Sequence, residues 1–177
     1  MSTRSAIGRV TGPGKFSAIY HHWDGYPTGL GATLWELYHT HFKKDIEAML
    51  KFLIDDHPAG WSTINGADFS LPAGYNEDIG GREKPHGPSC FCHGGRNEEK
   101  GWVITEKNAS GSGCEYVYAF TKKEGHNIML VLSKDGNKMV GFFGFGDKKA
   151  TWKQIAEIDL DGKAGPDART KWSEIGP

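Results

Sequence analysis

One apolar stripe constrains the fold of this 177-residue chain more than any other feature. Apolar residues recur at spacings of four and three, which is the period of one face of an α-helix. The stripe consists of Leu30, Leu34, Tyr38, Phe42, Ile46, Met49 and Leu53. A capping box that begins at Thr33 would start this helix, and Pro58 would end it. The pattern predicts one helix over 34–55, about 33 Å long at about 1.5 Å per residue.

Strand-like segments lie on both sides of this stripe. Residues 4–10 and 16–22 alternate and are joined by a glycine-proline turn, which predicts a hairpin. Residues 114–120 and 126–133 look like two more strands, and an Asp-Gly turn leads into another at 138–145. We therefore expect an α+β fold, in which an antiparallel sheet carries one long helix packed across one face.

Length and composition favour one soluble domain. Apolar residues make up 37% and charged residues 24% of the chain, which suits a globular protein and argues against disorder. We expect a single α+β domain over 1–160 and a loosely ordered C-terminal tail over 161–177, where glycine, proline and charge dominate. The 3 cysteines are an odd number, which argues against a disulfide framework.

The charge balance and the apolar runs exclude several classes of partner. With 21 basic and 22 acidic residues, the chain has no basic excess and so no strong nucleic-acid signature. The longest strongly apolar run, 128–132, is too short to span a bilayer, and no apolar signal segment follows the first residues. We expect a cytoplasmic protein without a membrane partner. The sequence sets no oligomeric state.

A joint at 20–31, Tyr-His-His-Trp-Asp-Gly-Tyr-Pro-Thr-Gly-Leu-Gly, lies where the hairpin ends and the helix pattern begins. Glycines near a helix N-terminus can expose backbone N–H groups to an anion, and the helix dipole adds positive potential there. The predicted ligand-binding residues are His21, His22, Asp24, Tyr26, Gly29 and Gly31. Alternatively, the glycines only permit a tight turn, in which Asp24 forms an Asx turn.

The same joint offers candidates for catalysis. Asp24 close to His22 could orient an imidazole for acid–base chemistry, so these two residues are the candidate catalytic pair. A hydrogen-bonded structural His–Asp pair is the alternative interpretation.

A second constellation, in a segment with little periodicity, predicts a metal site. Zinc is held in proteins by four cysteine, histidine or carboxylate ligands in a tetrahedron. The candidate ligands are His86, Cys90, Cys92 and Cys114, with His93 as the alternative to His86. Such a zinc ion would attach the irregular segment 59–96 to the sheet. The spacing departs from paired Cys-x-x-Cys knuckles, and free, partly buried thiols or a nucleophilic Cys92 are the competing interpretations.

Three blocks of sequence resemble a known group of proteins. They are Met1-Ser2-Thr3-Arg4, the run Tyr-His-His-Trp-Asp-Gly-Tyr-Pro at 20–27, and Cys-Phe-Cys-His-Gly at 90–94. Together they resemble small uncharacterised proteins of bacteriophages and prophage-bearing bacteria. The resemblance implies a dispensable accessory protein of phage type, located in the host cell cytoplasm. It implies no residue roles, because the group has no established activity.

These observations give one leading hypothesis and two alternatives. The leading hypothesis is an accessory protein that binds a nucleotide, another small phosphate-containing ligand, or a host protein at the joint, in the way that phage proteins antagonise host defence. One alternative is a hydrolase or nuclease that uses a metal or the His22–Asp24 pair. The other is an interaction protein with a structural zinc ion.

Overall fold

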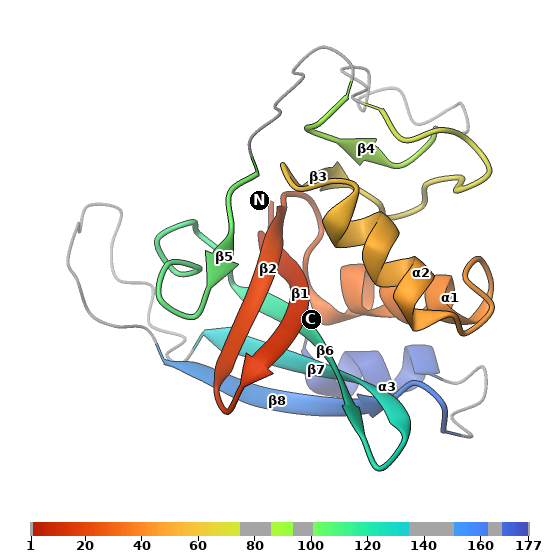
Figure 1. Ribbon diagram of the computed structural model, residues 1–177. Coiled ribbons are helices and arrows are strands. Elements are labelled where there is room, and N and C mark those ends of the chain that lie inside the picture. The colour runs from red at the N-terminus through yellow and green to blue at the C-terminus, as the bar shows by residue number, and fades with distance from the viewer. Residues whose placement is uncertain (1, 75–85, 94–100, 135–150, 163–167, 177) are drawn as a thin grey trace.

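The computed structural model describes residues 2–74, 86–93, 101–134, 151–162 and 168–176. Within these residues the fold is dominated by a mixed, eight-stranded sheet with the order β4-β3-β2-β1-β6-β7-β8, and β5 also pairs with β2 (Figure 1). The strands are β1 (Ser5–Gly12), β2 (Lys15–His21), β3 (Trp61–Thr63), β4 (Ser89–Cys90), β5 (Ile104–Thr105), β6 (Tyr116–Lys123), β7 (His126–Lys134) and β8 (Trp152–Asp159).

The helical segments are short. They are two π-helical turns, η1 (Pro27–Gly31) and η2 (Lys51–Asp55), and the α-helices α1 (Ala32–His39), α2 (Ile46–Leu50) and α3 (Ala168–Ile175). Figure 1 shows α1 and α2 together beside the β1–β2 hairpin, and α3 beside the β6–β8 part of the sheet. None of the helices in the described residues is long and apolar enough to cross a membrane.

The predicted single helix over 34–55 is wrong. The chain leaves α1 after His39 and starts again at α2, because Lys43 and Lys44 adopt left-handed backbone conformations with φ of 47° and 68°. The side chain of Asp45 then caps α2 by accepting a hydrogen bond from the backbone N–H of Ala48 at 3.0 Å. The apolar stripe is still largely buried, but it is divided between two short helices that both contact the core.

The predicted start of this helix is also corrected. Instead of capping the helix, the Thr33 hydroxyl donates a hydrogen bond to the carbonyl of Gly29 at 3.0 Å. The helical backbone begins earlier, at Pro27, where the ring's fixed φ suits a first helical turn.

The predicted antiparallel sheet with one long helix is wrong as a fold class. The β1–β2 and β6–β7 hairpins are antiparallel as expected, and β7 is a central strand between β6 and β8. However, β1 pairs with β6 in parallel, and β2 pairs with β3 in parallel, so the sheet is mixed. The strand expected at 138–145 lies outside the described residues.

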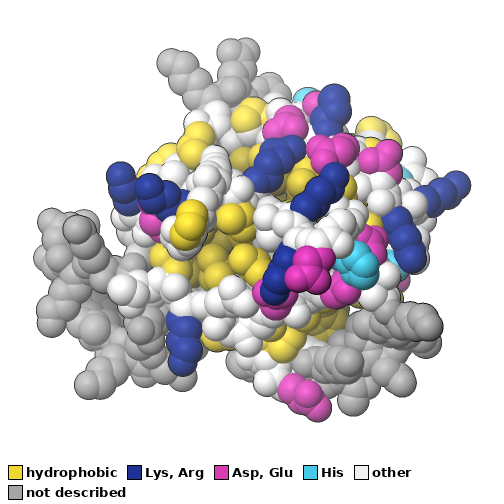
Figure 2. Space-filling view, turned by 60° about the horizontal axis from the view of Figure 1, so that its bottom comes forward, with side chains coloured by type: hydrophobic (Ala, Val, Ile, Leu, Met, Phe, Trp, Pro, Cys, Tyr) yellow, Lys and Arg dark blue, Asp and Glu magenta, His cyan; other side chains and the backbone are white. Residues whose placement is uncertain are grey.

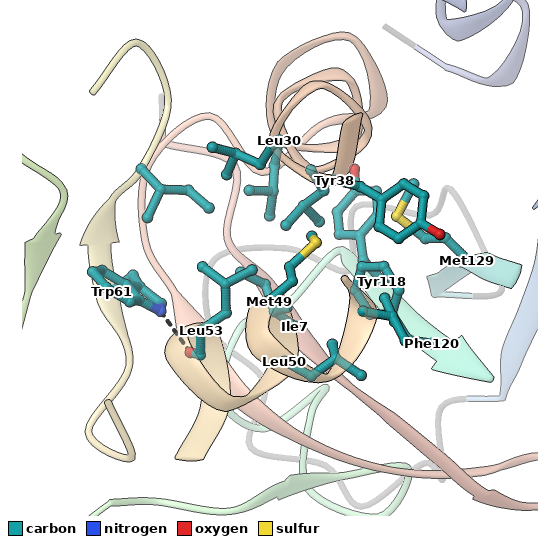
Figure 3. Packing of buried hydrophobic residues seen from close by; sticks show 14 of the residues in the cluster. Ile7, Leu30, Tyr38, Met49, Leu50, Leu53, Trp61, Tyr118, Phe120 and Met129 are labelled. Carbon is teal, nitrogen blue, oxygen red and sulfur yellow. Dashed lines mark hydrogen bonds between the residues drawn. The ribbon is translucent and has the colours of Figure 1, made fainter. Parts of the chain in front are cut away.

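The sheet separates two apolar clusters. The larger one lies between the sheet and the helices and includes Met49, Leu53, Trp61 and Tyr118. Figure 3 shows these side chains meeting, and the indole N–H of Trp61 donates to the carbonyl of Leu53 at 2.8 Å. The smaller cluster lies on the opposite face and consists of Ala6, Phe16, Ala18, Ile104, Ala109, Cys114, Val117 and Ala119.

The C-terminal segment contributes to the larger cluster. Trp172 of α3, which belongs to the tail expected to be loosely ordered, is only 2% exposed. A side chain at Gly31 would meet its ring, because a Cβ there would lie 2.7 Å from the nearest ring atom of Trp172. The glycine therefore lets α3 approach η1 closely.

Candidate metal centre

Pairing of two short strands builds the most concentrated group of possible metal ligands. β3 continues the sheet beyond β2, where Trp61 lies opposite His21. β4 then pairs antiparallel with β3, and Cys90 lies opposite Trp61. A hydrogen bond of 3.0 Å from the N–H of Phe91 to the carbonyl of Gly60 continues this pairing beyond Cys90. The strand pairing thus brings the segment after β4 to the residues that follow η2.

His57, Cys90 and His93 meet at this place. One ligand atom from each residue lies within 4.8 Å of the other two. The Cys90 Sγ is 3.2 Å from the His93 Nδ1, and the two imidazole rings are 5.3 Å apart between centroids. Cys90 is fully buried, His57 is buried, and His93 is exposed. This group could hold a metal ion, with two ligands in the protein interior and one at the surface.

The surroundings of His57 fix which of its nitrogen atoms is available. Its Nδ1 lies 2.7 Å from the backbone carbonyl of Phe52, so this nitrogen carries the proton and donates it. The lone pair is therefore on Nε2. Burial is the main cause that lowers the pKa of His57, which keeps the ring neutral. A neutral imidazole whose second nitrogen donates to a carbonyl is the usual arrangement of a metal-bound histidine.

The surroundings of Cys90 oppose and support a thiolate at the same time. Burial raises the pKa of the Cys90 thiol and is the largest effect. Hydrogen bonds from the backbone N–H groups of His93 and Cys92 act in the other direction, because they favour the negative sulfur. A bound cation would tip this balance, since a metal ion deprotonates the thiol that it binds.

The structure brings together some of the predicted ligands and separates the others. Cys90 and the alternative ligand His93 are adjacent, whereas the Cys92 Sγ accepts a hydrogen bond from the N–H of Ala59 at 3.3 Å. The Nδ1 of His86 lies 3.2 Å from the carbonyl of Gly87, and this ring is not part of the group.

Cys114 lies in the smaller cluster on the opposite face of the sheet, where burial raises the pKa of its thiol to about 12. All three cysteines carry free thiols. The structure therefore does not bring the four residues of the predicted set together around one point.

Sequence reasoning missed His57. Its position next to Pro58 made it part of the signal for the end of a helix. A usable signal was present in Cys90-Phe-Cys-His93, because Cys-x-x-His has the same two-residue gap as a zinc knuckle. The third ligand could not be read from spacing, since only the β3–β4 pairing brings it close.

The histidines of the joint have other surroundings. His21 is fully buried, its Nδ1 lies 3.2 Å from the Ser5 hydroxyl, and burial lowers its pKa to about 3. The Nδ1 of His22 lies 2.8 Å from the hydroxyl of Tyr20, and its ring packs edge-on against Trp23.

Asp24 and the glycines of the joint form a tight turn. Asp24 has a left-handed backbone with φ of 54°, and its carbonyl accepts the N–H of Leu30 at 3.0 Å. The N–H of Gly29, which was expected to face an anion, donates to the carbonyl of Tyr26 at 3.0 Å. A Cβ at Gly29 would lie 2.5 Å from the carbonyl oxygen of Asp24. The joint therefore uses these groups for its own turn.

Comparison with known proteins adds no assignment. No family model matches this chain, and no curated protein and no solved structure matches it either. The arguments about function below rest on the residues and their geometry.

Proposed function

We propose that this protein is a zinc-binding protein whose metal ion fixes a surface for a partner. The observation that carries the proposal is the convergence of His57, Cys90 and His93 within 4.8 Å. The ligand atoms would be the Nε2 of His57, the Sγ of Cys90 and the Nδ1 of His93. Two of these residues are buried, and the backbone already orients them.

The donor atoms select the metal. Nitrogen and thiolate ligands favour zinc among the common cations, whereas calcium and magnesium prefer oxygen. The group contains two imidazoles and one thiol and no carboxylate. Zinc is therefore the ion that this centre would bind in a cell.

The proposed metal ion supports a segment that has few other attachments. β4 is only 2 residues long and pairs with a strand of 3 residues, which by itself holds little. A zinc ion at the centre would connect the end of η2 with the segment that follows β4. It would do this through side chains that lie far apart in the sequence. Its role would be to fix where residues 86–93 lie.

One residue of that segment belongs to a row of aromatic rings. Phe91 lies between the cysteines and stacks against Tyr20, with ring centroids 6.4 Å apart. Tyr20 contacts His22, and His22 contacts Trp23, which is 43% exposed. Aromatic side chains are enriched where proteins bind partners. We assign partner binding in the phage-type accessory role to this row.

The charges on the surface agree with a protein partner better than with nucleic acid. Figure 2 shows basic and acidic side chains interspersed around an apolar area on one face. Several basic residues have an acidic neighbour, as in Arg9 with Asp55 at 2.8 Å and Lys123 with Glu157 at 2.9 Å. Such pairs weaken the attraction of phosphate backbones.

A metal-dependent hydrolase is the second candidate. Catalytic zinc sites keep three protein ligands and a water molecule, and the group found here has three members, one of them exposed. This candidate predicts zinc-dependent turnover of an activated ester or phosphodiester that is lost in Cys90→Ala. Absence of such turnover in the zinc-loaded protein leaves the structural role.

The zinc content of the purified protein tests the proposal. Protein prepared without chelators is expected to contain one zinc ion per chain, and Cys90→Ala is expected to contain almost none. His86→Ala serves as the matched control, because His86 lies in the same segment but outside the group, and it should keep its zinc. A wild-type protein without bound zinc after refolding with excess zinc would refute the proposal.

A further inference from the structure

The proposed zinc ion has three ligands in the structure and needs a fourth to complete a tetrahedron. We propose that the Sγ of Cys92 is this fourth ligand, so that the site is a closed centre of two cysteines and two histidines. This inference rests on the proposed function. It decides between the structural and the catalytic interpretation, since a closed centre has no position for water or substrate.

The position of Cys92 supports this assignment. It lies one residue before His93 and two residues after Cys90, and its half-buried side chain packs against the larger apolar cluster. Its Sγ is 3.3 Å from the backbone nitrogen of Ala59. Ala59 follows His57 by two residues, so the sulfur lies between the two stretches of chain that carry the ligands. No other cysteine is comparably close, because Cys114 is on the opposite face of the sheet.

Only a small movement separates the present side chain from a ligand position. The Cys92 sulfur is held by one N–H donor, and sulfur is a weak acceptor. Rotation about the Cα–Cβ bond takes a cysteine from one staggered position to another without moving the backbone. A bond of about 2.3 Å between zinc and sulfur would replace the weak contact.

The charges also favour two cysteines. With Cys90 alone, zinc and one thiolate leave a net charge of +1 beside a buried histidine and a fully buried sulfur. A second thiolate makes the centre neutral, which lowers the cost of keeping it away from water. The thiols of Cys90 and Cys92 are near enough that charge on one raises the pKa of the other, and a dication between them would remove that conflict.

Substitution of cobalt(II) for zinc tests the number of thiolates. Each thiolate bound to cobalt adds to a charge-transfer absorption in the near ultraviolet, so the intensity per bound metal counts the cysteine ligands. The full-length wild-type protein is expected to show two thiolates and the visible bands of a tetrahedral ion. Cys92→Ala is expected to have about half the intensity per bound cobalt, by ligand count. Cys114→Ala is the matched control, and it should keep the wild-type intensity.

Three outcomes separate this inference from the proposal on which it rests. Wild-type intensity per bound cobalt in Cys92→Ala would overturn the fourth ligand but leave the zinc site intact. Unchanged cobalt binding in Cys90→Ala, or none in the wild type, would instead refute the zinc site itself. X-ray absorption of the zinc-loaded wild type needs no substitution and should find two sulfur neighbours. One sulfur neighbour would overturn the inference.

Discussion

Two histidine-rich regions of this protein differ in how their polar atoms are used. In the joint at 20–31, the nitrogen atoms and N–H groups bond to nearby residues of the chain, as His22 does with Tyr20 and Gly29 with Tyr26. In the metal centre, three ligand atoms from separate places in the sequence converge. A high local density of histidine therefore marks a turn here, and convergence of distant residues marks the candidate site.

The contrast is clearest between two buried histidines. Burial keeps both His21 and His57 neutral. The Nε2 of His21 is buried without a hydrogen-bond partner, whereas His57 belongs to a group with a thiol and a second imidazole. Burial and neutrality are thus common to both, and the neighbours make the difference.

Removal of the metal should have the largest effect on this comparison. A ligand that binds only the folded state stabilises it by about 4 kcal/mol when its free concentration is 1,000 times its Kd. We expect chelation of zinc to lower the free energy of unfolding by about this amount and to expose Phe91 and the rest of segment 86–93 to hydrogen exchange. Denaturant unfolding and exchange mass spectrometry measure both effects. Equal protection with and without chelator would show that the metal does not hold this segment.

A substitution in the joint should affect stability but not the metal. A Cβ at Gly29 would lie 2.5 Å from the carbonyl oxygen of Asp24, so Gly29→Ala must distort the turn. We expect a loss of about 1–3 kcal/mol, as for other overpacked sites, with unchanged zinc content. Gly74→Ala is the control, because a Cβ there would meet nothing within 4 Å. A large drop in zinc affinity in Gly29→Ala would show that the two regions depend on each other.

His21 should make the protein sensitive to acid. Its pKa is about 3 in the folded state, against an ordinary value of 6.5, so the unfolded chain binds a proton that the folded chain refuses. The corresponding stability is present above pH 6.5 and is lost as the pH falls toward 3. Between pH 6.5 and 5 the loss is about 2 kcal/mol, since each pH unit corresponds to about 1.4 kcal/mol. His21→Gln should unfold with a flatter pH dependence in this range, and an equal slope in both proteins would contradict the assignment.

A His–Asp pair does occur in the structure, but it lies elsewhere. The Nδ1 of His126 is 2.8 Å from a carboxylate oxygen of Asp159, and this hydrogen bond is the main cause that raises the pKa of His126. Its small stabilisation is complete below the unfolded pKa near 6.5 and disappears as the pH rises through the higher folded pKa. NMR titration should show a raised His126 pKa that returns toward 6.5 in Asp159→Asn, and no change would refute the pair.

Local features of the fold could be predicted from the sequence. The hairpin of β1 and β2 and the pairing of β6 with β7 follow from alternating residues on either side of short turns. The parallel pairing of β1 with β6 joins residues about a hundred positions apart and leaves no local pattern. The break between α1 and α2 was hidden because Lys43 and Lys44 adopt a backbone conformation that usually indicates glycine.

The candidate site was predictable only in part, for the same reason. Cys90 and His93 are close in the sequence, so their cluster was visible as a possible zinc site. His57 joins them only because β3 and β4 pair. The separation of Cys114 likewise depends on which face of the sheet its segment covers, which spacing alone does not determine.

The affinity for zinc of His57→Ala tests the central claim most directly. Competition with a chromophoric chelator should show at least about 100-fold weaker binding than in the wild type, because a ligand and its oriented lone pair are both lost. His86→Ala, the histidine substitution outside the group, should bind zinc as the wild type does. Equal zinc affinity in the wild type and in His57→Ala would contradict the account.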